Sequence, residues 1–136
     1  MIGKAIALVA LTILPTLSFA ETCGMLKDFA TNGLLPAPNG VEAYCTVSRV
    51  LGAGRSEDCF WRYPLRSDVA RDQFETMRVQ LRACADGPVE VQATGVNHPD
   101  SFDQMTGQVN GIAVSLSLKD KGGLAQTLVV LRRQLP

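Results

Sequence analysis

The stretch from Cys59 to Cys84 constrains the fold most, because its residue pattern changes period within a few positions. From Cys59 to Leu65 every second side chain is apolar or aromatic, which is typical of a strand with one buried face. From Asp68 to Cys84 apolar residues recur at spacings of three and four, which is typical of a helix with one buried stripe. The stripe comprises Ala70, Phe74, Met77, Leu81 and Cys84. We therefore expect a strand followed by a long helix that covers it.

Both ends of this helix carry the expected signals. Ser67 or Asp68 can cap its first turn by accepting a hydrogen bond from an unpaired backbone N–H. Gly87 and Pro88 follow its end, where glycine tolerates a left-handed turn and proline cannot continue a helix. At about 1.5 Å per residue, the helix from Asp68 to Cys84 is about 25 Å long.

Other segments alternate with period two and are interpreted as strands. They are 41–51, 89–94, 102–109, 112–119 and 124–133. Asn110-Gly111 separates two of them and predicts a two-residue hairpin turn, because both positions of a type I′ turn need positive φ. That register places Val109 opposite Ile112, and it gives the hairpin one apolar and one polar face. A glycine-rich turn near Ala53 or Gly54 joins the first strand to the Cys59 strand.

These elements predict an α+β fold. The expected sheet is antiparallel with about six strands, arranged as a two-strand hairpin, the long helix and a four-strand meander. The long helix packs on one face of the sheet. A short N-terminal helix over 23–31 completes the domain.

The N-terminus has the pattern of a secretory signal peptide. Lys4 supplies a positive charge, 6–14 form an apolar core, and Ser18-Phe19-Ala20 is a small-x-small cleavage site. We expect residues 1–20 to be removed and 21–136 to form a single disulfide-stabilised domain, periplasmic or secreted. The apolar run is shorter than the roughly 20 residues of a membrane span, so no span is expected after cleavage.

Charge argues against two classes of partner. The full chain has 13 basic and 13 acidic residues. Loss of Lys4 with the leader leaves 12 basic and 13 acidic residues, a net charge of −1. The nine arginines are scattered along the chain rather than clustered. Nucleic acid and anionic membranes are therefore not the expected partners.

Four cysteines follow the leader, and an even number in an exported chain predicts disulfides. With the first hairpin turning near Ala53 or Gly54, Cys45 faces position 62. Cys59 is then offset from it by roughly three residues, or about 10 Å, which exceeds the roughly 7 Å limit between the Cα atoms of a disulfide. We therefore favour Cys23–Cys45 and Cys59–Cys84.

No strong catalytic or metal-binding motif is present. The chain has a single histidine, His98, in a turn that also holds Asp100 and Asp103. These three side chains could form a small hydrolytic or metal-assisted site. A histidine before proline in a turn is more often structural, and no second histidine is available for a metal. No cofactor is expected.

The last strand raises the question of a partner surface. If Leu128 and Val130 face the core, Val129 and Leu131 point to the opposite face of the sheet. Either that face is covered, or the two side chains form an exposed apolar patch that binds a partner.

Three functions remain in competition. The first is an exported, non-catalytic module that binds another envelope or secreted protein, in the manner of an inhibitor or immunity protein. The second is a small enzyme that uses His98 with Asp100 or Asp103. The third is a small-molecule carrier with a pocket between helix and sheet. Its lining would be Trp61, Tyr63, Phe74 and Met77, which are otherwise core residues.

Overall fold

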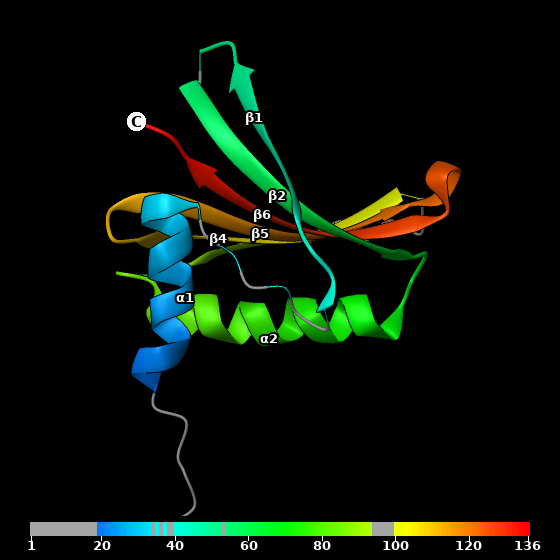
Figure 1. Cartoon of the computed structure of the whole chain (residues 1–136), viewed down its shortest axis with the longest axis horizontal. Coiled ribbons are helices and arrows are strands. Elements are labelled where there is room, and N and C mark those ends of the chain that lie inside the picture. Colours follow the sequence, from blue (N-terminus) through cyan, green and yellow to red (C-terminus); the bar gives the residue numbers. More distant parts are fainter. Residues whose placement is uncertain (1–18, 34, 36, 38–39, 53, 94–99) are drawn as a thin grey trace, which may run out of the picture.

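The computed structural model describes residues 19–33, 35, 37, 40–52, 54–93 and 100–136. Two α-helices and six strands make up the fold (Figure 1). The helices are α1 (Phe19–Asn32) and α2 (Asp68–Cys84). The strands are β1 (Tyr44–Val50), β2 (Gly54–Pro64), β3 (Glu90–Ala93), β4 (Asp100–Val109), β5 (Ile112–Lys121) and β6 (Gln126–Gln134). The prediction of an α+β fold with a six-stranded antiparallel sheet is confirmed. Most of the predicted leader lies outside the described residues.

The sheet is antiparallel throughout, with strand order β1-β2-β6-β5-β4-β3. The first hairpin, β1–β2, forms one edge of the sheet, and α2 then connects β2 to β3 at the opposite edge. Strands β3 to β6 follow as a meander that runs back toward β2. The last strand therefore closes against β2 in the middle of the sheet. At the β4–β5 turn the predicted register is confirmed: Val109 pairs with Ile112, and Asn110 and Gly111 have φ of 51° and 74°.

Helix α2 occupies the predicted residues and buries the predicted stripe. The Ser67 side chain caps it by accepting a hydrogen bond from the Ala70 N–H at 3.5 Å. Gln73 is also buried, where its Oε1 accepts a hydrogen bond from the Tyr63 hydroxyl. A polar side chain can lie in the core here because strand β2 supplies its partner.

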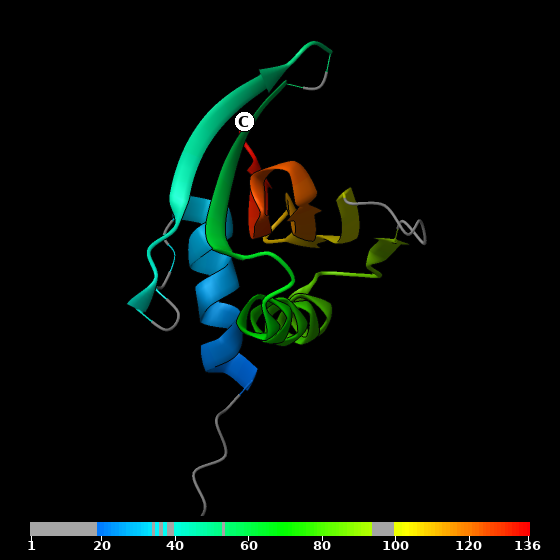
Figure 2. The same cartoon turned by 90° about the vertical axis from the view of Figure 1, so that its right-hand side faces the viewer.

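Both helices lie on the same side of the sheet, and no described helix covers the opposite face, which is called the open face from here on (Figures 1 and 2). Val130, Ser115 and Ser117 on that face are nevertheless buried. The core between the layers is one cluster of apolar side chains from α1, α2 and the central strands. Its largest fully buried member is Trp61 on β2. The first hairpin, β1–β2, rises out of this layered body and curves over the open face (Figure 2).

Helix α1 is longer than the predicted 23–31 segment. Its buried face carries Leu26, Phe29 and Ala30, which contact the core. The helix ends at Gly33, whose φ of 71° needs glycine. The Arg133 guanidinium reaches back to this end and donates to the carbonyls of Ala30 and Thr31 at 3.4 and 3.3 Å. The end of the last strand thus holds the end of the first helix.

The favoured disulfide pairing is wrong. The structure has Cys23–Cys84, with Cα atoms 5.3 Å apart, and Cys45–Cys59. In the first hairpin Val50 pairs with Gly54, so the turn lies earlier than expected and Cys45 stands directly opposite Cys59. Helix α1 packs against α2, which brings Cys23 to the end of α2.

Candidate binding surface on the projecting hairpin

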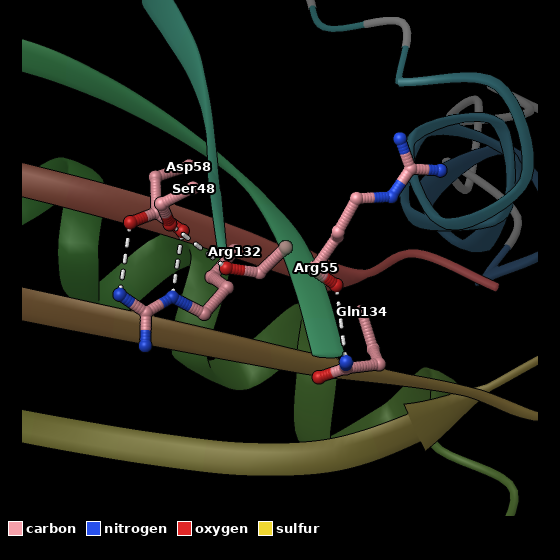
Figure 3. Close-up of polar contacts among 6 residues, drawn as sticks. Ser48, Arg55, Asp58, Arg132 and Gln134 are labelled. Atoms are coloured by element: carbon pink, nitrogen blue, oxygen red, sulfur yellow. Dashed lines mark hydrogen bonds and ion pairs between the residues drawn. The ribbon is translucent and has the colours of Figure 1, made fainter. Parts of the chain in front are cut away.

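The β1–β2 hairpin reaches beyond the rest of the sheet. Strand β6 pairs with β2 from Pro64 back to Ser56 and then ends. The remainder of the hairpin, from Arg49 through the turn to Arg55, extends past this pairing (Figure 1). It contacts the end of the chain at the Arg55 carbonyl, which accepts hydrogen bonds from the Leu135 N–H at 2.9 Å and from the Gln134 side chain at 3.0 Å (Figure 3). Strand β1 is also the edge of the sheet, and no other described strand pairs with its far side. The hairpin is thus the element that protrudes furthest from the helical layer (Figures 1 and 2).

The base of this hairpin is held by the Cys45–Cys59 disulfide and by two ion pairs to β6. Glu57 and Arg133 face each other on the helix side of the sheet, with Oε1 and Nε 2.9 Å apart. Asp58 and Arg132 face each other on the open side. Because neighbouring residues carry the two pairs, β2 is held to β6 on both faces. These contacts tie the base of the hairpin to β6.

The Asp58–Arg132 pair is bidentate (Figure 3). Arg132 donates from Nε at 2.6 Å and from Nη2 at 2.8 Å to the two carboxylate oxygens. Hydrogen bonding to Asp58 is the main cause that raises the pKa of Arg132, and it outweighs partial burial, which acts to lower that pKa. Beside it, the Ser48 and Ser56 hydroxyls are hydrogen-bonded at 3.2 Å. The open side of the hairpin base is thus a satisfied polar network.

The far end of the hairpin is apolar and exposed. Leu51 in the turn is fully exposed, and Val47, which lies on β1 opposite Glu57 at the base of the hairpin, is 58% exposed. Val47 lies on the helix side of the sheet, in the row of Cys45. Exposed apolar side chains are ordinary when scattered, but an apolar side chain at the end of a projecting hairpin is available to contact a partner.

The same end is also basic. Arg49 and Arg55 stand directly opposite each other across β1 and β2. Like charges in that position destabilise a sheet. Neither guanidinium has an acidic partner among the described side chains, and the Arg55 side chain extends away from the Asp58–Arg132 pair (Figure 3). Residues 48–56 contain no Asp or Glu, so this segment carries two unneutralised positive charges.

An aromatic pair lies at the start of β1, on the open side. The Tyr44 and Phe60 rings stack with centroids 6.0 Å apart. The Arg62 guanidinium lies over both, at 4.8 Å from the Tyr44 centroid and 5.2 Å from the Phe60 centroid. Such cation–π contacts hold the arginine against the sheet. They place a positive charge on the open side of β2, the opposite face from Arg49 and Arg55.

Positive charge continues across the open face as far as β5. Lys119 lies there, between Leu128 on β6 and Phe102 on β4. Burial lowers its pKa, and the nearby charges of Arg132 and Lys121 lower it further, while Asp58 opposes them. The open face is therefore more basic than acidic along β2, β6 and β5.

A separate groove lies at the other end of the sheet, between α2 and the edge strand β3. Its volume is about 220 Å³. Its lining combines apolar and charged side chains from α2, β3 and β4: Phe74, Glu75, Arg78, Val91, Asp103, Gln104 and Met105. Of the predicted carrier pocket only Phe74 borders it. Trp61, Tyr63 and Met77 are buried in the core instead.

The predicted polar site is only partly described. His98 and the side chain of Asp100 lie outside the described residues. Asp103 lies on β4, paired with Ala93 and Leu118, and borders the α2–β3 groove. Within the described part of the chain, no group of three or more His, Cys, Asp or Glu side chains could hold a metal ion.

The predicted partner patch at Val129 and Leu131 is wrong, because both side chains are fully buried. The two residues pair with Leu118 and Leu116 on the helix-covered side of the sheet. Leu128 and Val130 are the side chains that face the open side. The connection from β5 to β6 contains a 3-10 helix, Gly122–Leu124, rather than a tight turn. The odd-numbered residues of β6, not the even-numbered ones, therefore face the core.

Sequence reasoning did not identify the hairpin tip. The signal was present: Arg49, Leu51 and Arg55 flank Gly52 in a segment without acidic residues. Its meaning depends on register, because only the observed pairing places the two arginines opposite each other.

No protein-family model, curated protein or solved structure matches the chain. No helix within the described ranges has the length and apolar character needed to cross a membrane. The geometry of the hairpin is therefore the main indication of what this protein does.

Proposed function

We propose that this protein is an exported, non-catalytic binding module whose contact element is the β1–β2 hairpin, and that its partner is a protein with an acidic, apolar-lined surface. The observation that carries the proposal is the fully exposed Leu51 beside the opposed Arg49 and Arg55 at the hairpin tip, with the exposed Val47 two residues before Arg49. Inhibitors and immunity-type proteins act in this way, by presenting a preorganised element to another protein.

The charges of the tip favour an acidic partner. Elsewhere on β2 each acidic residue is matched by a basic residue directly opposite on β6. At the tip two basic residues oppose each other, which lowers the stability of the free protein. Carboxylates on a partner would relieve that repulsion and accept charge-assisted hydrogen bonds. They would also speed association by electrostatic steering.

The cross-linked base of the hairpin favours tight binding at small contact area. Ordering a loop on binding costs affinity, and a cross-linked hairpin avoids much of that cost. The Cys45–Cys59 disulfide and the two ion pairs supply this order before any partner arrives. The two disulfides also support residence in an oxidising compartment.

The test is capture of a partner from crosslinked extract of exported proteins, with the disulfide-bonded protein as bait. Burying a leucine contributes about 1.5–3 kcal/mol, so Leu51→Ser should reduce capture roughly tenfold or more. Arg49→Glu/Arg55→Glu should reduce it further and remove its salt dependence. Leu124→Ser is the matched control, because Leu124 is 68% exposed and lies after β5, outside the hairpin.

Two outcomes would contradict the proposal. One is a partner retained in full by both hairpin variants. The other is a partner lost equally with Leu124→Ser, which would place the contact elsewhere. Circular dichroism of each variant separates loss of binding from loss of folding.

The α2–β3 groove supports a second candidate, carriage of a small molecule. It combines apolar walls with Arg78, a placement that suits an amphipathic anion. Its volume of about 220 Å³ is below the roughly 300–1,000 Å³ of ordinary ligand pockets, so we rank it second. Phe74→Ala should then reduce ligand-induced quenching of Trp61 fluorescence, and a metabolite panel without any quenching would argue against a carrier.

A further inference from the structure

Strand β1 offers a seven-residue free edge. Its residues from Tyr44 to Val50 pair one to one with β2, without a bulge. The backbone groups on its far side have no described strand to bond. An edge of this kind is a template for another strand.

Protective features are few along this edge. Exposed edges are commonly guarded by lysine, proline, a bulge or extreme shortness. Strand β1 contains neither lysine nor proline, and Arg49 near its end is its only charged residue. The opposite edge of the sheet, β3, is only four residues long and begins with Glu90. Of the two edges, β1 is therefore the better acceptor.

The side chains of β1 specify what an added strand should carry. On the helix side, Val47 is exposed and apolar, and Arg49 follows it about 7 Å along the strand. A residue directly opposite Val47 should be apolar or β-branched, and one opposite Arg49 should be acidic. On the open side, Thr46 and Ser48 suit small hydroxyl side chains.

We propose that the partner binds by adding an extended strand, antiparallel, to the free edge of β1, with an acidic side chain opposite Arg49 and an apolar one opposite Val47. This inference rests on the proposed function and specifies its mode: main-chain hydrogen bonds give affinity, and the two side-chain positions give specificity. The occupant is a segment of another protein, not a second copy of this chain. In a two-fold pairing about Val47, each Arg49 would face Cys45 of the other copy and remain without a carboxylate.

The probe is an N-acetylated, C-amidated peptide of sequence Thr-Glu-Thr-Val-Thr-Val-Thr. Aligned antiparallel, its Glu lies opposite Arg49 and its first Val opposite Val47. Titration into the 15N-labelled, disulfide-bonded protein should produce saturable shifts of the amides of β1 and slow their hydrogen exchange. Replacing the peptide's Glu by Lys turns an opposite-charge pair into a like-charge pair, and should weaken binding roughly fivefold.

Three exposed valines provide matched variants. Val47 on β1, Val91 on β3 and Val79 on α2 are 58%, 56% and 61% exposed. Val47→Lys should weaken peptide binding at least as much as the Glu-to-Lys peptide does. Val91→Lys and Val79→Lys should leave it unchanged. All three substitutions are at the surface, so each variant should keep the amide spectrum of a folded protein.

The outcomes separate the two proposals. Shifts confined to β1 and lost with Val47→Lys support strand addition. Shifts at β3 that respond to Val91→Lys would overturn strand addition to β1. Absence of peptide binding at millimolar concentration, while partner capture still depends on Leu51, would also overturn strand addition. In that case the proposed function stands, and the partner binds the hairpin in another way. A concentration-dependent dimer abolished by Val47→Lys would also overturn strand addition by another protein, because the occupant of the edge would then be a second copy.

Discussion

Removing the Cys45–Cys59 disulfide should loosen the hairpin more than the rest of the domain. The suitable variant is Cys45→Ala/Cys59→Val, because Cys45 is exposed whereas Cys59 is fully buried, and valine preserves volume in the core. The disulfide joins residues 14 apart. For a loop of that length, chain entropy predicts a loss of about 3 kcal/mol in the free energy of unfolding. In a domain of this size that lowers Tm by about 12 °C.

The comparison is with Cys23→Ala/Cys84→Ala, which removes the disulfide between residues 61 apart. The longer loop predicts a loss of about 4 kcal/mol. Urea denaturation gives both free energies, and hydrogen exchange monitored by mass spectrometry locates the change. In Cys45→Ala/Cys59→Val the amides of the hairpin should exchange faster than those of α2, and partner capture should fall because the contact element is no longer preorganised.

Two results would refute this reasoning. One is an unchanged free energy of unfolding in Cys45→Ala/Cys59→Val. The other is peptide mapping of the native protein that recovers Cys23 joined to Cys45. Faster exchange spread evenly over the whole domain would show that the disulfide stabilises the fold without ordering the hairpin.

Two further predictions concern groups near the hairpin base. Gly33→Ala should lower the free energy of unfolding by about 1–3 kcal/mol in urea denaturation, because φ is 71° there and a Cβ would strike the Glu57–Arg133 pair; wild-type stability would contradict this. Lys119→Met should raise stability at pH 7. The pKa of Lys119 is lowered from 10.5 by burial and by Arg132, so the folded protein is less stable when the Lys119 side chain is charged. The gain should therefore shrink as pH rises through the lowered pKa toward 10.5; a gain that grows with pH would contradict the argument.

The parts of the fold that follow from local chemistry were predicted well. Helix α2 begins after Ser67, whose side chain caps it as predicted. It ends at Cys84, where Ala85 is already extended, and Gly87 does not adopt the left-handed conformation that the sequence suggested. The register at Asn110-Gly111 follows because one two-residue turn fits those residues and the alternation on both sides. Local signals of this strength need no knowledge of the rest of the molecule.

The first hairpin shows where local reasoning fails. Gly52 and Gly54 both adopt positive φ, at 82° and 77°, so glycine alone does not say where the strand reverses. A turn placed slightly too late moves the partner of Cys45 by three positions, and that shift alone excluded the disulfide that the structure contains. The other disulfide depends on how α1 packs against α2, which is a contact between distant segments.

The same limit applies to the candidate site. Leu51 and Arg49 are unremarkable in the sequence, and Arg55 is six residues beyond Arg49. Their significance comes from the pairing of the two arginines across β1 and β2, and from the end of β6 at Gln134, beyond which the hairpin continues. Val129 and Leu131 illustrate the converse: a 3-10 turn at Gly122–Leu124 shifts the phase of β6 and buries residues that alternation had placed outside.

The most direct test of the central claim is hydrogen exchange of this protein with and without its captured partner, compared between the hairpin and α2. Binding of the partner to the hairpin should slow exchange of the amides between Tyr44 and Arg55 and leave exchange in α2 unchanged. Protection that appears at α2 and β3, with the hairpin unchanged, would contradict the account and move the binding site to the groove at the other edge of the sheet.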